Sequence, residues 1–141
     1  MKHGERDALE TFAGLLACAP LPLTGTLVPV PTTRRRAAAR GFDQAVVLAR
    51  RLARLRGVTC AEMLVKRGRA QEGRSRAQRL AAVGRFRLRP GACAQATAVT
   101  LIDDVCTTGA TLADAMQTLG AAGVIVGGII AVARSDGTDP T

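Results

Sequence analysis

Hydrophobic positions recur at helical spacing in three stretches of the chain, at residues 7–17, 44–56 and 111–122. In the stretch 44–56 the apolar side chains gather on one face. Three arginines fall on the other face, as in an amphipathic helix with a solvent-exposed side. The pattern predicts three helices, and the prolines at positions 20 and 22 end the first of them.

Continuous apolar runs predict buried strands at residues 26–31, 98–102 and 124–132, with a further strand at 60–65. The polar, arginine-rich residues 32–42 are predicted to form a loop after the first strand. Strand, loop, helix and strand follow one another in the second half of the chain. This order predicts an α/β fold, with a parallel twisted sheet flanked by helices and right-handed crossovers.

Positive charge is concentrated in the middle of the chain. The 141 residues include 20 Lys+Arg and 11 Asp+Glu, a net charge of +9, and residues 34–89 hold 17 of the basic residues but 3 of the acidic ones. This imbalance predicts an anionic ligand or partner. A hydrophobic content of 48% excludes a disordered basic tail, and 2% aromatic residues disfavour a base-stacking surface. The length fits one domain, spanning residues 1–141.

The cysteines and the histidine limit the chemistry further. The 4 cysteines are dispersed without a C-x-x-C pair, which disfavours a zinc ribbon or a disulfide framework. The only histidine is His3, so His-based triads are excluded. The uncharged apolar stretch at residues 120–133 is shorter than a membrane span. We therefore expect a cytoplasmic protein with reduced thiols and no membrane span.

One segment combines acidic, hydroxyl and glycine residues directly after a predicted strand. Asp103 and Asp104 follow the apolar run, and a turn with Thr107, Thr108 and Gly109 opens the next helix. Ligands of parallel α/β folds gather at the carboxyl ends of strands, where helix-start amides and threonine hydroxyls can surround a phosphate. Neighbouring carboxylates can accept hydrogen bonds from sugar hydroxyls or bind magnesium. The segment predicts a ribose phosphate ligand; the alternative is a simple helix cap at Asp103.

The segment 99–111 resembles the 5-phosphoribosyl-1-pyrophosphate (PRPP) binding motif of type I phosphoribosyltransferases. The runs Val28-Pro29-Val30-Pro31 and Arg40-Gly41-Phe42-Asp43-Gln44 narrow the resemblance to the ComF family of competence-associated proteins. It covers residues 7–134. The resemblance implies a type I phosphoribosyltransferase-like fold with a flexible hood loop at 66–85, after an N-terminal helix and lead-in at 1–24.

The chain departs from the family pattern in three ways. Asp43 and Ala82 stand where the family usually has asparagine. We also expect no cysteine-rich N-terminal zinc module of the kind that many relatives carry. The first two departures leave the chemistry at the acceptor side open.

The resemblance implies a role for each motif residue. Asp103 and Asp104 would hold the ribose hydroxyls and, indirectly, the magnesium of the PRPP complex. The 5′-phosphate would be held by the loop of Val105, Cys106, Thr107, Thr108, Gly109, Ala110 and Thr111. The pyrophosphate would be contacted by Arg40, Gly41, Lys66 and Arg67. By contrast, the three arginines Arg34, Arg35 and Arg36 are interpreted as solvent-exposed.

The implied activity is transfer of a phosphoribosyl group from PRPP to a nitrogen acceptor with release of pyrophosphate, with magnesium as cofactor. No residue is assigned as the general base, and the acceptor is open. One alternative is a non-catalytic ComF-like accessory for DNA uptake that binds single-stranded DNA or a competence helicase. Another is a regulator that senses a nucleotide in the same pocket. A homodimer is also compatible with the resemblance.

Overall fold

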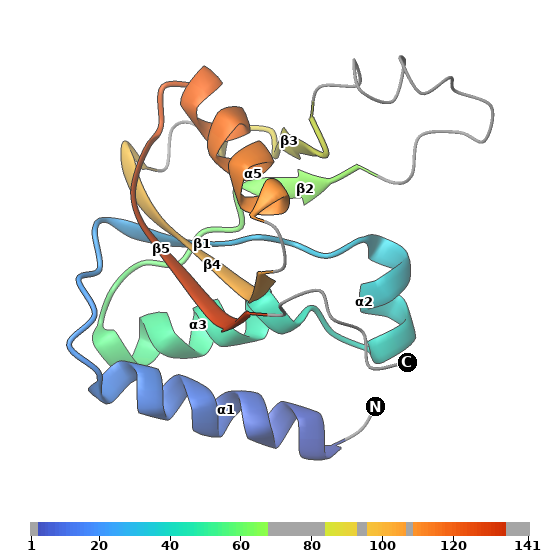
Figure 1. Ribbon diagram of the computed structural model, residues 1–141, viewed down its shortest axis with the longest axis vertical. Coiled ribbons are helices and arrows are strands. Elements are labelled where there is room, and N and C mark those ends of the chain that lie inside the picture. Colours follow the sequence, from blue (N-terminus) through green and yellow to red (C-terminus); the bar gives the residue numbers. More distant parts are fainter. Residues whose placement is uncertain (1–2, 68–83, 93–95, 107–108, 135–141) are drawn as a thin grey trace.

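A parallel sheet with helices on both faces forms the centre of the molecule (Figure 1). The computed structural model describes residues 3–67, 84–92, 96–106 and 109–134. In this part the sheet has the order β1-β4-β5, with β1 at Thr26–Pro29, β4 at Ala98–Cys106 and β5 at Ile125–Arg134. The flanking helices are α1 at His3–Cys18 and α3 at Gln44–Arg56 on one face and α5 at Ala110–Ala121 on the other. The predicted fold class is confirmed.

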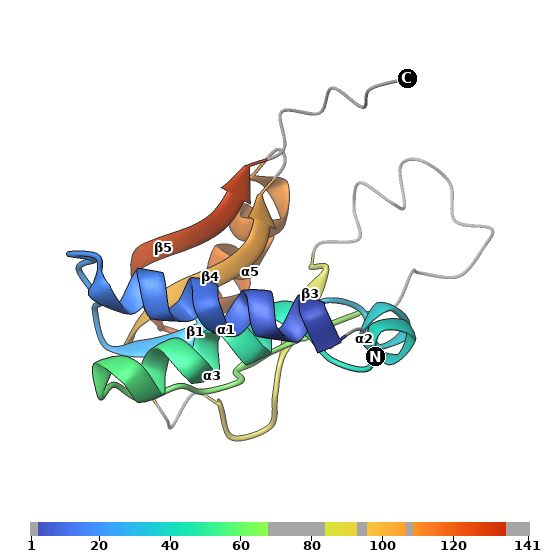
Figure 2. The ribbon, with the colours of Figure 1, turned by 90° about the horizontal axis from the view of Figure 1, so that it is seen from below.

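Each face of the sheet has its own hydrophobic core, because successive side chains of a strand point to opposite faces. Leu101 of β4 belongs to the core beneath α5, and its neighbour Ile102 belongs to the core beneath α1 and α3. Figure 2 shows α1 and α3 side by side, where Ala13 and Leu48 share the second core. The strand at 98–102 is apolar on both faces for this reason.

A short antiparallel hairpin replaces the predicted strand at 60–65. Its strands are β2 at Leu64–Lys66 and β3 at Phe86–Leu88, and it forms a sheet of its own. Cys60 makes only an isolated parallel bridge, with Leu27 of β1. The chain leaves the main sheet after this bridge and turns into the hairpin. β3 was not predicted, because three residues with a central arginine carry no readable strand pattern.

The predicted loop at 32–42 is wrong over most of its length. Its residues form helix α2 at Arg34–Arg40. Thr33 caps the start by accepting a hydrogen bond from the Arg36 amide at 3.2 Å. Gly41 ends it in the left-handed conformation, with φ of 85°, and its amide donates to the Ala37 carbonyl at 2.8 Å. Three consecutive alanines favour this helix despite its lack of an apolar face.

The other elements agree with the sequence pattern more closely. The predicted helix at 44–56 has the observed bounds of α3. Strand β4 continues past residue 102 to Cys106, because β5 pairs beside it as far as Arg134. The helix suggested near 75–83 lies outside the described residues. None of the helices described is long and apolar enough to cross a membrane.

Candidate functional site

The two adjacent carboxylates lie in the last half of strand β4. Asp103 is buried, with 5% of its surface exposed, and pairs in register with Ala131 of β5. Asp104 is partly exposed. Helix α5 is capped by Gly109, six residues beyond Asp103 in the chain. The alternative that Asp103 is the helix cap is therefore wrong.

Lys66, the last residue of β2, connects the hairpin electrostatically to these carboxylates. Burial lowers the pKa of the Lys66 ammonium, and the positive charges of Arg36 and Arg85 lower it further. Asp103 and Asp104 act on the same pKa in the opposite direction. The ammonium therefore lies within electrostatic reach of two arginines and two carboxylates from α2, β4 and the start of β3.

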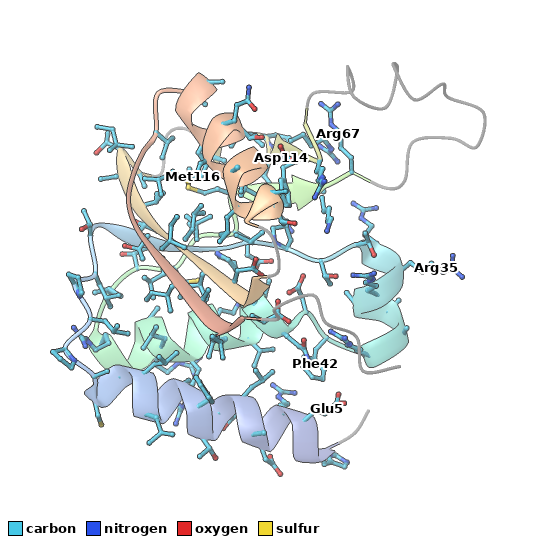
Figure 3. The ribbon with its side chains drawn as sticks, in the orientation of Figure 1. Glu5, Arg35, Phe42, Arg67, Asp114 and Met116 are labelled. Atoms are coloured by element: carbon cyan, nitrogen blue, oxygen red, sulfur yellow. The ribbon has the colours of Figure 1, made fainter. Side chains whose placement is uncertain are left out.

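The Arg85 side chain links the β2–β3 hairpin to the first turns of α5. Its Nε lies 3.0 Å from the Asp114 Oδ2, and its Nη1 donates a hydrogen bond to the Thr111 Oγ1 at 3.3 Å. The backbone carbonyl of Arg85 accepts from the Arg67 amide at 2.7 Å. Figure 3 places Arg67 and Asp114 at this corner of the molecule. Because Thr111 uses an acceptor lone pair toward Arg85, its hydroxyl proton is left to donate to a ligand.

Helix α5 begins without a side-chain cap. Its N-cap, Gly109, has φ of 79°, a conformation that favours glycine over residues with a Cβ. Among the described residues other than its chain neighbours, no atom lies within 4 Å of the position that a Cβ would occupy there. Backbone amides at such a start, next to a threonine hydroxyl, can bind an anion. Of the predicted phosphate loop, Thr107 and Thr108 lie outside the described residues.

On helix α2, the charge that acts on Lys66 comes from Arg36. Arg40, which the resemblance favours, is exposed and donates through Nη1 to the Gln44 Oε1 at 2.8 Å. The amide of Gly41 is already used to cap α2. The sequence pattern predicts a loop at 32–42 and therefore gives no signal for Arg36. In the observed helix, Arg36 and Arg40 share a face four residues apart.

The Asp43 carboxylate accepts hydrogen bonds from residues on both sides of helix α2. Its Oδ1 accepts from the Ala45 and Val46 amides at 3.1 and 3.4 Å, which caps helix α3. Its Oδ2 accepts from the Thr32 amide at 2.8 Å. One carboxylate thus joins the chain just before α2 to the start of α3. Asp43 therefore has a structural role in this chain.

Solved structures with a similar fold come from purine metabolism. The chain is similar to an allosteric regulatory enzyme of purine biosynthesis, with a TM-score of 0.60 and 18% identity over 92% of this chain and 26% of the other. An adenine phosphoribosyltransferase gives 0.54 and 16% over 94% of this chain and 71% of the other. The adenine phosphoribosyltransferase of Leishmania donovani gives 0.50 and 18% over 91% and 53%.

These similarities define the fold and not the activity. The identities are low, and the chain spans only part of each of these proteins, about a quarter of the first. The sequence matches no protein-family profile and no curated protein. The chain has a phosphoribosyltransferase-type α/β fold, which agrees with the expectation drawn from its motifs.

Proposed function

We propose that the protein binds PRPP or a ribose-5-phosphate nucleotide together with magnesium, and transfers the phosphoribosyl group to a nitrogen acceptor. The observation that carries this proposal is the position of the Asp103–Asp104 pair in the last half of β4, ahead of the glycine-led start of α5 and within electrostatic range of Lys66. Cations and acids lie together at the carboxyl end of a parallel strand, where α/β folds bind ligands.

Each chemical part of such a ligand has suitable partners here. The ribose hydroxyls donate to Asp103 and Asp104, which accept hydrogen bonds when ionised. The 5′-phosphate is held at the start of α5, with Gly109 and the Thr111 hydroxyl as described members. These roles correspond to the phosphate loop 105–111 inferred from the motif.

The pyrophosphate group lies against the cations of the hairpin end and α2. Lys66 and Arg67 supply two of them, and Arg36 adds a third that the motif did not suggest. Arg40 and Gly41 belong to the same group by resemblance, although their described contacts lie within α2 and with Gln44. Positive charge held in place stabilises the leaving pyrophosphate as the bond to the anomeric carbon breaks.

The residues present fit a magnesium ion that arrives with the ligand. Among the described residues no three His, Cys, Asp or Glu side chains form a cluster that could hold a metal. Asp103 and Asp104 offer two hard oxygen donors, and Mg²⁺ usually takes its remaining ligands from water and substrate phosphates. Bound there, it would neutralise charge on the ribose and pyrophosphate oxygens.

A thermal shift experiment tests binding. PRPP with magnesium should raise the melting temperature, because a ligand that binds the folded state stabilises it. The double variant Asp103→Asn/Asp104→Asn and the single variant Asp104→Asn should abolish the gain. Asp7→Asn removes an exposed carboxylate on α1 and should keep the gain. An absent shift at millimolar PRPP would contradict binding. Pyrophosphate release with a panel of nucleobases then tests transfer.

Single-stranded DNA binding is a second candidate, favoured by the exposed arginines of α2. Arg35 points away from the body of the molecule (Figure 3) and is not needed for the PRPP proposal. Phosphate contacts of this kind predict affinity that falls steeply with salt. Arg35→Ala should then weaken DNA binding and leave the PRPP thermal shift intact. If the affinity for DNA changes neither with salt concentration nor in Arg35→Ala, this role is ruled out. The DNA-uptake function expected of a ComF-like protein is then ruled out as well.

A further inference from the structure

A cavity of about 730 Å³ lies between α2, the first turns of α3 and the β2–β3 hairpin. These elements face one another on the right side of Figure 1. Its walls include Thr32 and Lys66 but none of Asp103, Asp104 or Thr111. The cavity therefore adjoins the candidate PRPP site and shares Lys66 with it, but the motif analysis assigns no ligand to its other walls.

The walls of this cavity carry an excess of positive charge. The basic residues that line it are Arg6, Arg34, Arg50, Lys66, Arg87 and Arg89. Of the acidic residues in the described part of the chain, Asp43 and Glu62 line the cavity and oppose this charge. Both carboxylates are already engaged, Asp43 by backbone amides and Glu62 by ion pairs to Arg50 and, at 3.5 Å, to Arg89.

Two of the lining arginines are available to bind an anionic ligand. Within the described part of the chain, neither Arg34 nor Arg87 has an ion pair or side-chain hydrogen bond, and both are exposed. Arg34 belongs to α2 and Arg87 to β3, so they approach the cavity from different elements. Guanidinium groups placed in this way suit a phosphate chain, which they can bind in a bidentate manner.

Most of the uncharged residues in the lining are apolar. Phe42, Val46, Val47 and Leu64 contribute to it, each of them buried or half-buried. Inorganic phosphate alone would make no use of such a surface, whereas a nucleobase can stack on an aromatic ring and contact aliphatic groups. Cavities that hold small ligands typically measure about 300–1,000 Å³, which includes the volume found here.

We propose that this cavity is a second ligand site, which binds a nucleoside triphosphate. The phosphates contact Arg34 and Arg87, and the base lies against Phe42 and the neighbouring valines. The site shares Lys66 with the function proposed above, but Arg34, Arg87 and Phe42, on which the tests below rely, lie outside the proposed PRPP machinery.

Isothermal titration calorimetry of the full chain with ATP tests this site. Arg34→Ala/Arg87→Ala should weaken ATP binding by at least about tenfold, since each charged hydrogen bond contributes on that scale. Arg54→Ala removes an exposed arginine of α3 that does not line the cavity, and it should bind ATP as the wild type does. Asp104→Asn should also keep ATP binding while losing the PRPP thermal shift.

Two further probes test the base contact. Tripolyphosphate should bind at least about tenfold more weakly than ATP, because stacking and apolar contact contribute on that scale. Phe42→Leu should weaken ATP binding and leave tripolyphosphate binding unchanged.

Several results would overturn the proposal. These are no ATP binding at millimolar concentration, equal losses in Arg54→Ala and the double variant, or tripolyphosphate binding as tightly as ATP. ATP binding lost in Asp104→Asn but kept in the double variant would place the nucleotide in the PRPP site instead. A dimer in sedimentation that Arg34→Ala/Arg87→Ala dissociates, without ATP binding, would assign the cavity to a second copy of the chain.

Discussion

Replacing Asp43 should loosen the α2 segment and lower the stability of the whole fold. The Asp43 carboxylate accepts three backbone hydrogen bonds, two from the start of α3 and one from Thr32. Asp43→Ala removes all of them without introducing a group that could take their place. The loss of an N-cap side chain costs about 1 kcal/mol. An unpaired amide costs a further ~1 kcal/mol where water has partial access, as it has at half-buried Thr32.

The expected total is about 2 kcal/mol of unfolding free energy. Asp43→Asn should cost about half as much, because its single amide oxygen can cap α3 or accept from Thr32 but cannot do both. Asp7→Ala is the matched control, since Asp7 is exposed and the described contacts of its side chain do not include any hydrogen bond. A surface change of this kind is expected to stay within about 0.5 kcal/mol.

Urea unfolding followed by circular dichroism measures these differences. With a slope of about 2 kcal/mol/M, Asp43→Ala should lower the midpoint by roughly 1 M, and Asp43→Asn should fall between it and the wild type. Amide hydrogen exchange adds a local test, because Thr32 should lose protection in Asp43→Ala before the core does. Equal stability of Asp43→Ala and Asp7→Ala, with Thr32 still protected, would refute the reasoning.

Three further changes test contacts elsewhere in the fold. Arg56 donates to three backbone carbonyls at the end of α1 over 3.0–3.2 Å, so Arg56→Ala should cost about 1.5–3 kcal/mol in urea unfolding, and equality with Arg54→Ala would contradict this. The buried Thr100 hydroxyl bonds both the amide and the carbonyl of Thr24, so Thr100→Val should cost about 1–3 kcal/mol despite its matched shape. The pKa of Lys66 is lowered in the folded state, so folding releases protons and stability rises with pH toward its usual value of 10.5. Lys66→Met should lack this rise, and parallel stability–pH curves for variant and wild type would count against it.

The parts of the fold that could be predicted depend on local pattern. Helix α3 has apolar and basic residues on opposite faces, so its limits followed from spacing alone. The run before Asp103 was apolar on every residue but one, and a doubly covered strand is expected to look so. These elements frame the candidate site. The apolar run predicts a strand that ends just before the two acids, and in the structure β4 includes both of them.

The missed parts depend on contacts that no local pattern contains. Helix α2 buries no residue, so hydrophobic periodicity could not reveal it, and only its alanines and flanking cap residues were a usable signal. Arg85 meets Thr111 across 26 residues of sequence, through a hairpin whose second strand is three residues long. Contacts between residues so far apart in sequence form only in the folded chain. The contact between the hairpin and α5 therefore could not be predicted from a local pattern.

The two proposed sites share one cation, and this should couple them. Lys66 lies within electrostatic range of the Asp103–Asp104 pair and also lines the cavity. An anion bound on either side uses part of the attraction of its ammonium, and the two polyanions repel each other across a short distance. ATP should therefore weaken PRPP binding, and linkage requires PRPP to weaken ATP binding by the same factor.

The variant Lys66→Met removes the attraction that both ligands share, so each ligand alone should bind more weakly. The repulsion between two bound ligands remains in this variant. Titration of PRPP at fixed ATP concentrations, with Arg34→Ala/Arg87→Ala as the control, separates this coupling from direct competition. If the sites are coupled, the apparent Kd of PRPP rises to a plateau at high ATP concentration. If the ligands compete for one site, it rises without limit.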